Sequence, residues 1–436
     1  MLLIYTEKIS PRLQYVLDFI FNDIAKTEYT ITSDLEYFTN YENIKINYSS
    51  KRICSYEYFL PSNTFIFEND LCLKKLNIFN FQNTKAIFPT HTEGDFSFDI
   101  FSAVFLMLSR FEEYQPYIKD AHGRFKPSES IAFKNNFLDK PVVNIWLKYF
   151  LSSLNKKFNI NLPTQARKFK FINTIDIDIA FSYANKGLYR NLFGYLRDFK
   201  NFNFKDILLR TKVLGKLAHD PYDTYDYILK IHQKYMLNTI FFVHVGDYGL
   251  YDKNIPFKNN KFRDLIRHLS DYAEIGIHPS YESSTKNEKL HTEIERLSEI
   301  IKKDVTKSRQ HFLRITLPHT YRNLIDAKIK EDYSLGFASE AGFRAGTCTP
   351  FKFFDLDANK TTSLTIKPFT IMDGTLKDYL NKSPDEAVAI TTDLLNHTKN
   401  LNGEFIMLWH NESLSNKQRW EGWQYVYEKM INLALE

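Results

Sequence analysis

Acidic side chains end a predicted strand in the second half of the sequence. In FINTIDIDIA, residues 171–180, Asp176 and Asp178 are two positions apart, so an extended chain places both carboxylates on one face. Two ionised carboxylates on one face repel each other, and a bound cation relieves this repulsion. The pattern predicts one Asp as a cation ligand and the other as a free general base. A solvated strand end or a helix N-cap is the structural alternative.

Imidazole and guanidinium groups end the next predicted strands. IGIHPSYES carries His278 directly before Pro279, where a neutral imidazole is a candidate ligand for zinc or another divalent ion. SRQHFLRI places Arg309 and His311 on one face of a predicted strand. There Arg309 would keep the base ionised, and His311 would complete the set of metal ligands. Each of these residue types also occurs as an ordinary structural residue at a sheet end.

Two further motifs carry candidate site residues. GFRAGT holds Arg344 between glycines, where the backbone can approach a ligand closely. FIMLWHN places Leu408 and His410 on one face of a strand, a pairing that could hold a small acyl methyl group and protonate a leaving group. We therefore expect Leu408 and Trp409 to bind substrate and His410 to be catalytic. A core histidine with satisfied hydrogen bonds is the alternative for His410.

The elements that must position these residues alternate between strands and helices. LNTIFFVHV, AEIGIHP and GEFIMLWH read as strands, and two capping boxes, at Thr292 with Glu295 and at Ser383 with Glu386, predict helix starts between them. This alternation is typical of parallel βα units and predicts an α/β fold, a distorted, full or incomplete β/α barrel. Catalytic residues in such barrels lie at the C-terminal ends of the strands.

The first part of the chain has a different pattern, in which short aromatic strands mix with helices. Its clearest predicted helix contains FDIFSAVFLMLSRFEEY, and the run NINLPTQARKFK, residues 159–170, is the predicted linker. A length of 436 residues favours two domains. We predict an N-terminal α+β accessory domain at residues 1–165, whose role the sequence does not indicate, and a catalytic barrel at residues 166–436.

Composition excludes some classes of function. Lys and Arg number 57 against 52 Asp and Glu, so the net charge of +5 gives no indication of nucleic-acid binding. The 3 cysteines lack CxxC spacing, which argues against a disulfide framework and a thiolate zinc site. MLLIYTEKISPR reads as a first strand and not as a signal peptide, and no apolar run approaches the roughly 20 residues of a membrane span. A cytoplasmic location is therefore expected.

One segment is longer than a simple βα connection. Residues 186–216, KGLYRNLFGYLRDFKNFNFKDILLRTKVLGK, are rich in Lys, Arg, Phe and Leu. The favoured interpretation is a pair of amphipathic helices with a solvated basic face. Docking to a membrane surface or to a lipid-linked glycan is the alternative.

In this order, TIDID, TIFFV, IGIHPSY, GFRAGT and LWH resemble the motifs of NodB-type polysaccharide deacetylases, carbohydrate esterase family four. The resemblance covers about residues 171–436. LSRFEEY and DAHGRF extend it weakly over the whole chain, toward a branch found in Bacteroidetes-like genomes. The resemblance implies a distorted β/α barrel that removes N-acetyl groups from amino sugars of a glycan or glycan precursor. It also implies one divalent metal, which we expect to be zinc.

The resemblance assigns roles to matching residues. Asp176 resembles the general base, Asp178 the first metal ligand, and His278 the first histidine of an H-x-x-x-H pair. Glu282 stands where the second histidine is expected. Either Glu282 supplies an oxygen ligand, or His311 substitutes for the missing histidine, which we prefer, or metal binding has been lost.

The remaining family motifs supply an arginine that orients the base and a histidine that acts as general acid. Arg309 and Arg344 compete for the first role, and His410 matches the second. Three functions stay open: a metal-dependent N-deacetylase, an amide hydrolase of the same fold without metal, and a carbohydrate-binding barrel without turnover. An acid and a base on facing strands favour an enzyme, because a binding module needs neither.

Overall fold

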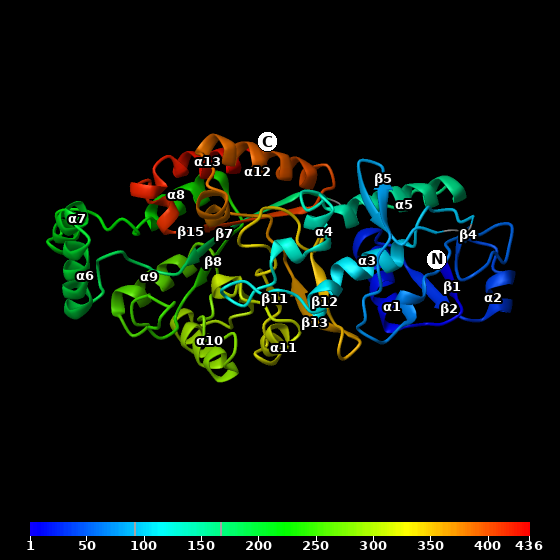
Figure 1. Cartoon of the computed structure of the whole chain (residues 1–436), viewed down its shortest axis with the longest axis horizontal. Coiled ribbons are helices and arrows are strands. Elements are labelled where there is room, and N and C mark those ends of the chain that lie inside the picture. The colour runs from blue at the N-terminus through cyan, green and yellow to red at the C-terminus, as the bar shows by residue number, and fades with distance from the viewer. Residues whose placement is uncertain (91–92, 166–167) are drawn as a thin grey trace.

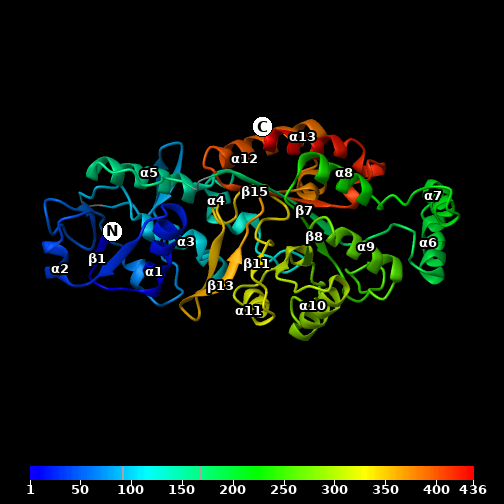
Figure 2. The same cartoon turned by 180° about the vertical axis from the view of Figure 1, so that it is seen from behind.

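A computed structural model describes residues 1–90, 93–165 and 168–436 and gives an elongated molecule (Figures 1 and 2). The N-terminal region lies at one end, and a curved sheet with its helices occupies the centre. A hairpin of helices α6 (Leu188–Lys200) and α7 (Phe204–Leu214) stands at the opposite end. Residues 166–167 of the predicted linker lie outside the described residues. None of the described helices combines the length and apolar character that crossing a bilayer requires.

The N-terminal region is built on a parallel sheet of order β2-β1-β3-β4. The opening strand predicted from MLLIYT is confirmed as β1, and all its residues are buried. An antiparallel hairpin, β5 with β6, lies beside this sheet. The strands are β1 (Leu2–Thr6), β2 (Tyr29–Thr32), β3 (Lys45–Tyr48), β4 (Tyr58–Phe59), β5 (Ile78–Phe81) and β6 (Thr84–Ile87).

Helices cover the N-terminal sheet and join it to the rest of the molecule. The predicted apolar helix is α3, which begins after an Asp99 N-cap and is buried throughout, but it ends at Leu108 and a short 3-10 turn follows. Phe105 of α3 packs edge-on against Phe354 of the second region. The helices are α1 (Pro11–Leu17), α2 (Leu35–Asn40), α3 (Ile100–Leu108), α4 (Ile131–Lys134) and α5 (Val142–Phe158).

The second region contains a sheet of order β12-β13-β11-β10-β9-β8-β7-β15-β14. Its strands are parallel except for the β12–β13 pair, so the predicted parallel βα units are confirmed. The strands are β7 (Lys170–Ile177), β8 (Thr239–Val243), β9 (Glu274–Ile277), β10 (Lys307–Ser308), β11 (Glu331–Asp332), β12 (Phe351–Asp355), β13 (Lys360–Ile366), β14 (Ile371–Met372) and β15 (Glu404–His410).

The helices of this region lie along both sides of the curved sheet (Figures 1 and 2). The capping box predicted at Ser383 is confirmed, since Ser383 and Glu386 each bind the other's backbone amide. The one predicted at Thr292 is wrong, because the helix already begins at Asn287 and Thr292 bonds back to Glu288. Besides α6 and α7, the helices are α8 (Tyr225–Tyr235), α9 (Asn260–Ser270), α10 (Asn287–Ile301), α11 (His319–Asp326), α12 (Pro384–Lys399) and α13 (Trp423–Leu435).

The predicted barrel is not closed by a ladder between the two outer strands of the sheet in the described residues. Instead, the chain between β13 and β14 crosses the gap. Phe369 donates its amide to the carbonyl of Leu335, just beyond β11, and Thr370 donates its amide to Ile406 of β15. The sheet is therefore curled into an incomplete barrel, and this brings the C-terminal ends of its strands around one space.

A buried ion pair joins the two regions. The guanidinium of Arg344 donates to both carboxylate oxygens of Glu113, at 3.0 and 2.6 Å, and both side chains are 3% exposed. Arg110 donates to the same carboxylate at 2.8 Å. The charge of these arginines outweighs the effect of burial and lowers the pKa of Glu113.

We expect Glu113→Gln to lower the free energy of unfolding by about 3–5 kcal/mol, because it leaves buried guanidinium groups without their counter-charge. The matched control is Glu299→Gln, which removes an exposed pair with Arg263 and should change the free energy of unfolding far less. Urea denaturation of both variants measures the difference. Equal costs would mean that the buried pair contributes no more than a surface pair.

Candidate active site

A cavity of about 320 Å³ lies where the C-terminal ends of the strands meet. Six of the residues predicted for the site line it: Asp176, Asp178, His278, His311, Leu408 and His410. These residues come from β7 and β15 and from the turns that follow β7, β9 and β10. Convergence of polar groups in one concave space is what a catalytic site requires.

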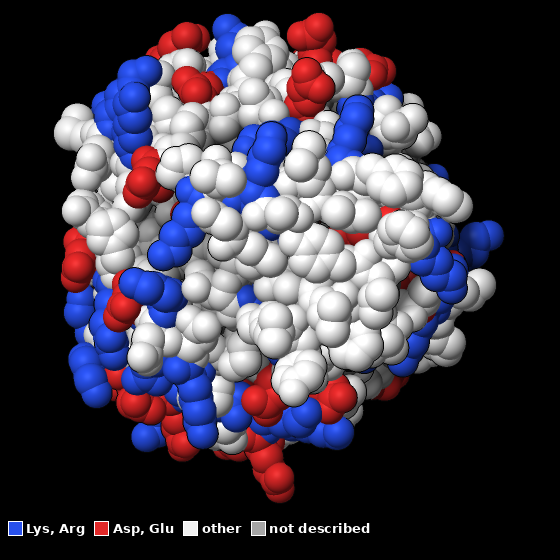
Figure 3. Space-filling view, turned by 90° about the vertical axis from the view of Figure 1, so that its left-hand side faces the viewer, with Lys and Arg blue, Asp and Glu red and all other residues white. Residues whose placement is uncertain are grey.

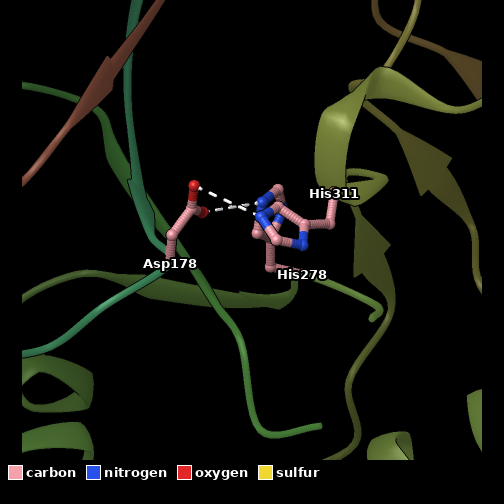
Figure 4. Close-up of side chains that lie close together, drawn as sticks. All are labelled: Asp178, His278 and His311. Carbon is pink, nitrogen blue, oxygen red and sulfur yellow. Dashed lines mark ion pairs between the residues drawn. The ribbon is translucent and has the colours of Figure 1, made fainter. Parts of the chain in front are cut away.

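Asp178, His278 and His311 face one another across this cavity (Figure 4). Asp178 Oδ1 lies 3.0 Å from His278 Nε2, and Asp178 Oδ2 lies 3.4 Å from His311 Nε2. Burial would raise the pKa of Asp178, but the two rings outweigh it and lower that pKa well below its usual value. Asp178 Oδ1 is buried and, apart from this contact with His278, accepts no hydrogen bond from the described residues.

Both imidazole rings are held by an oxygen at Nδ1. His278 Nδ1 lies 2.6 Å from the carbonyl of Arg309, and His311 Nδ1 lies 2.9 Å from Asp252 Oδ1. An Nδ1–H group that donates to oxygen leaves the lone pair on Nε2, which here points toward Asp178. Two imidazole nitrogens and a carboxylate are a common ligand set for a divalent ion that keeps one position open. The three residues therefore fit a divalent cation.

A third imidazole, that of His244, lies beside the ring of His311. His244 is fully buried, with Nε2 3.6 Å from Asp252 Oδ1, so His244, Asp252 and His311 form a second group of suitable ligand types. Burial lowers the pKa of His244 to about 4, so its ring is neutral. Burial also acts to lower the pKa of His311, but the charges of Asp178 and Asp252 raise it to about 9. A cation at His311 Nε2 would displace that proton.

Asp176, the other carboxylate of the TIDID motif, has a different environment from Asp178. It is 1% exposed, and Arg309 Nη1 lies 3.2 Å from its Oδ1. The same nitrogen donates to Thr174 at 2.7 Å, and Arg309 Nε donates to the carbonyl of Tyr333. Arg309 is thus fixed by several acceptors and presents its charge to Asp176. This pairing holds the carboxylate at the cavity, where it can accept a proton.

His410 ends β15 beside Asp176 of the paired strand β7, and its Nε2 lies 3.8 Å from Asp178 Oδ2. Its Nδ1 lies 2.8 Å from Asp373 Oδ1, and its backbone amide donates to Asp373 Oδ2. Burial would lower the pKa of His410, but the charge and hydrogen bond of Asp373 raise it well above its usual value. His410 therefore carries a proton that it can donate into the cavity.

The two residues predicted to bind substrate lie on opposite faces of β15. Leu408 lines the cavity. Trp409 does not line it, is 0% exposed, and packs in the core against Trp423 and Tyr427. The alternation of side chains along a strand explains the difference, because neighbouring residues point to opposite faces. The structure thus gives Trp409 a core position and leaves Leu408 as the apolar wall.

Two further predicted residues lie away from the cluster. Arg344 does not line the cavity and binds Glu113, as described above, so Arg309 is the arginine that contacts Asp176. Glu282 is an exposed residue that pairs with Lys286 and Lys289. His311, and not Glu282, occupies the place beside Asp178 and His278.

The segment SRQHFLRI differs from the strand that its sequence predicts. Strand β10 ends at Ser308, and a short turn over His311–Leu313 follows in which Phe312 has a positive φ of 58°. This turn brings the His311 ring over the cavity. The predicted strand is wrong at this point. Arg309 contacts Asp176 and His311 lies beside Asp178, but a turn and not a strand positions them.

Several residues of the site carry no signal that the sequence patterns detect. Asp252 and Asp373 hold the rings of His311 and His410, yet they lie in a loop and just after a strand of two residues. His244 directly follows the apolar strand β8. Its position at a buried strand end is the one feature of the sequence that points to it. Arg124 comes from DAHGRF of the N-terminal region and lines the cavity.

A buried acid lies behind the turn that follows His278. Glu293 of α10 is 2% exposed and accepts a hydrogen bond from the Ser280 amide at 2.9 Å. Burial raises its pKa from 4.5 to about 7. The folded state therefore holds this proton more tightly than the unfolded state does, and the protonated acid favours folding at low pH.

As the pH rises from about 4.5 to 7, the contribution of Glu293 to stability should fall by about 3 kcal/mol. We expect Glu293→Gln to abolish this dependence, so that the variant gains stability relative to the parent between pH 5 and pH 8. Denaturant titrations at both pH values measure the change. Glu295→Gln, on the exposed face of the same helix, is the control and should give no pH-dependent difference.

Comparison with known proteins gives limited matches. A family of unknown function, DUF7033, matches residues 2–159, less than half of the chain, and leaves the cavity residues of β7 and β15 outside the match. No curated protein matches the chain.

Solved structures resemble part of the chain at low identity. A structure named as a polysaccharide deacetylase of Mycobacterium smegmatis is 14% identical, with a TM-score of 0.40, over 63% of this chain and 86% of that one. One from Pseudomonas aeruginosa, of the same named activity, is 11% identical, with a TM-score of 0.36, over 61% and 83%. A CE4 family pseudoenzyme from Bacillus anthracis is 13% identical, with a TM-score of 0.29, over 61% of each chain. At these values the chemistry of the site must be argued from its own geometry.

Proposed function

We propose that this protein is a metal-dependent hydrolase that removes an N-acetyl group from an amino sugar of a glycan or glycan precursor. The observation that carries the proposal is the convergence of three ligand-type side chains, Asp178, His278 and His311. Beside them lie the carboxylate of Asp176, which pairs with Arg309, and the imidazole of His410, which pairs with Asp373. A base, an acid and a cation-binding set in one cavity are the parts that hydrolysis of an amide needs.

A divalent ion, for which nitrogen and oxygen ligands of this kind favour zinc, would polarise the acetyl carbonyl when bound. Asp176 takes a proton from the attacking water, because its carboxylate lines the cavity and Arg309 holds it in place. The water oxygen forms a bond to the acyl carbon, and a tetrahedral intermediate results. No covalent bond to the protein is required.

Breakdown of the intermediate needs a proton on the leaving nitrogen. His410 donates this proton from Nε2, and Asp373 stabilises the protonated ring before the transfer. The carbon–nitrogen bond breaks, and acetate and a free amine leave. Leu408 and Met372 supply an apolar wall that suits the acetyl methyl group.

The test is release of acetate and free amine from N-acetylated amino sugars and their oligomers, measured with zinc added and after chelation. The proposal expects turnover that disappears with the chelator and returns with the metal. Turnover that survives chelation would instead support an amide hydrolase without metal. Binding of the sugars without acetate release would support a carbohydrate-binding protein.

A further inference from the structure

The α6–α7 hairpin buries polar residues between its helices and exposes many of its apolar residues. Arg210 of α7 is 3% exposed, donates to Asp198 at 2.6 Å and donates to Asn191 at 3.1 Å, and both of these partners are buried residues of α6. A surface helix in water ordinarily has the opposite arrangement. The predicted pair of amphipathic helices is present, but its exposed surface carries many apolar side chains beside the basic ones.

The exposed apolar side chains lie on both helices and on the turn between them. Leu188 is 81% exposed, Phe193 is 68% and Phe202 is 79%. Figure 3 views this end of the molecule and shows a broad surface with few charged side chains. Its exposed apolar members are Leu188, Tyr189, Leu192, Phe193, Leu196, Phe199, Phe202, Phe204, Leu208, Leu214 and Leu217, which we call the hairpin face. An apolar patch of this extent indicates a surface that binds something.

Basic side chains border the hairpin face, and Figure 3 shows Lys and Arg around its edge. The segment contains few acids to balance them: Asp198 is buried against Arg210, and Asp206 binds Gln418. The basic residues of the segment are Lys186, Arg190, Arg197, Lys200, Lys205, Arg210, Lys212 and Lys216. An apolar face with a positive border complements a surface that has an anionic outer layer and an apolar layer beneath it.

A cleft of about 750 Å³ opens beside the hairpin face. Lys186, Arg190 and Lys253 line it, and Arg190 and Lys253 both lie over the ring of Tyr248. Burial lowers the pKa of Lys186 to about 8, the charge of Asp220 opposes this, and the neighbouring arginines act in the same direction as burial. Asp206 also lines the cleft. Several cations gathered in a concave space repel one another, and an anionic group would relieve this repulsion.

We propose that the hairpin face inserts into the interface of an anionic lipid bilayer, with lipid phosphate groups held by the basic border and the basic cleft. Aromatic and aliphatic residues on one face with Lys and Arg around them are the pattern of interfacial membrane helices. Ile179 lines both this cleft and the catalytic cavity, so docking would hold the cavity close to the membrane surface. The proposal does not depend on the hydrolytic function, because it concerns binding alone.

The experiment is co-sedimentation of the full chain with vesicles of phosphatidylcholine, with and without phosphatidylglycerol. We expect binding to the anionic vesicles that weakens as salt is added. Substitution Phe193→Glu together with Phe199→Glu should weaken this binding by at least about a hundredfold, because two aromatic side chains lose their apolar environment. Lys200→Ala with Lys205→Ala should weaken binding to anionic vesicles by about tenfold or more and leave the weak binding to neutral vesicles unchanged.

Met236→Glu is the matched control, since Met236 is 90% exposed but lies at the end of α8, outside the hairpin face. It should bind vesicles as the parent does. Unchanged binding of the double Phe variant, or no sedimentation of the parent with either vesicle, would overturn the proposal. A parent that is a dimer in solution, and that the double Phe variant converts to a monomer without any vesicle binding, would assign the hairpin face to a second copy of the chain.

Discussion

Asp176→Asn should lower kcat for acetate release by about 10²- to 10⁴-fold, because an amide cannot take the proton of the attacking water. The side chain keeps its shape, and Arg309 keeps its hydrogen bonds to Thr174 and to the carbonyl of Tyr333. Substrate affinity and metal content should therefore change little. A rate assay on N-acetylated substrate, with circular dichroism and metal analysis on the same samples, measures all three quantities.

The control for this variant is Asp355→Asn. Asp355 ends another strand of the same sheet, but it pairs with Arg322 and lies outside the cavity. Its rate should equal that of the parent. If Asp176→Asn kept full activity while the metal stayed bound, Asp176 would not be the base. Loss of activity together with loss of metal would identify Asp176 as a metal ligand and not as the base.

The candidate catalytic groups could be predicted from sequence where they end long apolar runs. Asp176, Asp178 and His410 follow buried strands, and in a parallel sheet such strand ends meet at one edge. The partners that fix the rings could not be predicted in this way. Asp252 lies in a loop, and Asp373 follows a strand of two residues, so neither has a periodic pattern around it. Only tertiary contact identifies them.

The hairpin face shows a different limit. Helical spacing places Leu188, Leu192 and Leu196 on one side of α6, but spacing alone does not tell whether that side faces the core or the exterior. The buried contact of Arg210 with Asp198 decides the direction. The same holds for Trp409, where alternation predicts two faces and only packing shows which one lines the cavity.

The N-terminal region forms part of the cavity wall. Arg124 lines the cavity, donates to the carbonyl of Phe312 at 2.8 Å, and is bound by Asp120. Phe312 follows His311 directly, so this contact fixes the turn that carries a candidate ligand. The N-terminal region thus supports the geometry of the site through this hydrogen bond, through that of Arg314 with the carbonyl of His122, and through the interface around Glu113.

His278→Ala should lower zinc affinity by more than about 100-fold, because it removes a ligand and not merely the partner of a ligand. Asp252→Asn should cost about 10- to 100-fold, since it loosens the His311 ring without removing a ligand atom. Competition of the purified proteins with a zinc-binding dye measures both effects without an activity assay. The surface residue His268 gives the control, and His268→Ala should leave the affinity unchanged.

The same measurement distinguishes the two groups of ligand-type residues that share His311. If zinc binds between Asp178, His278 and His311, His244→Gln should change affinity far less than His278→Ala does. If it binds between His244, Asp252 and His311, the order of the two effects reverses. The geometry favours the first site, because His311 Nδ1 is already bound to Asp252 and His311 Nε2 faces Asp178. A cation there lies in the cavity beside Asp176 and His410, where hydrolysis needs it.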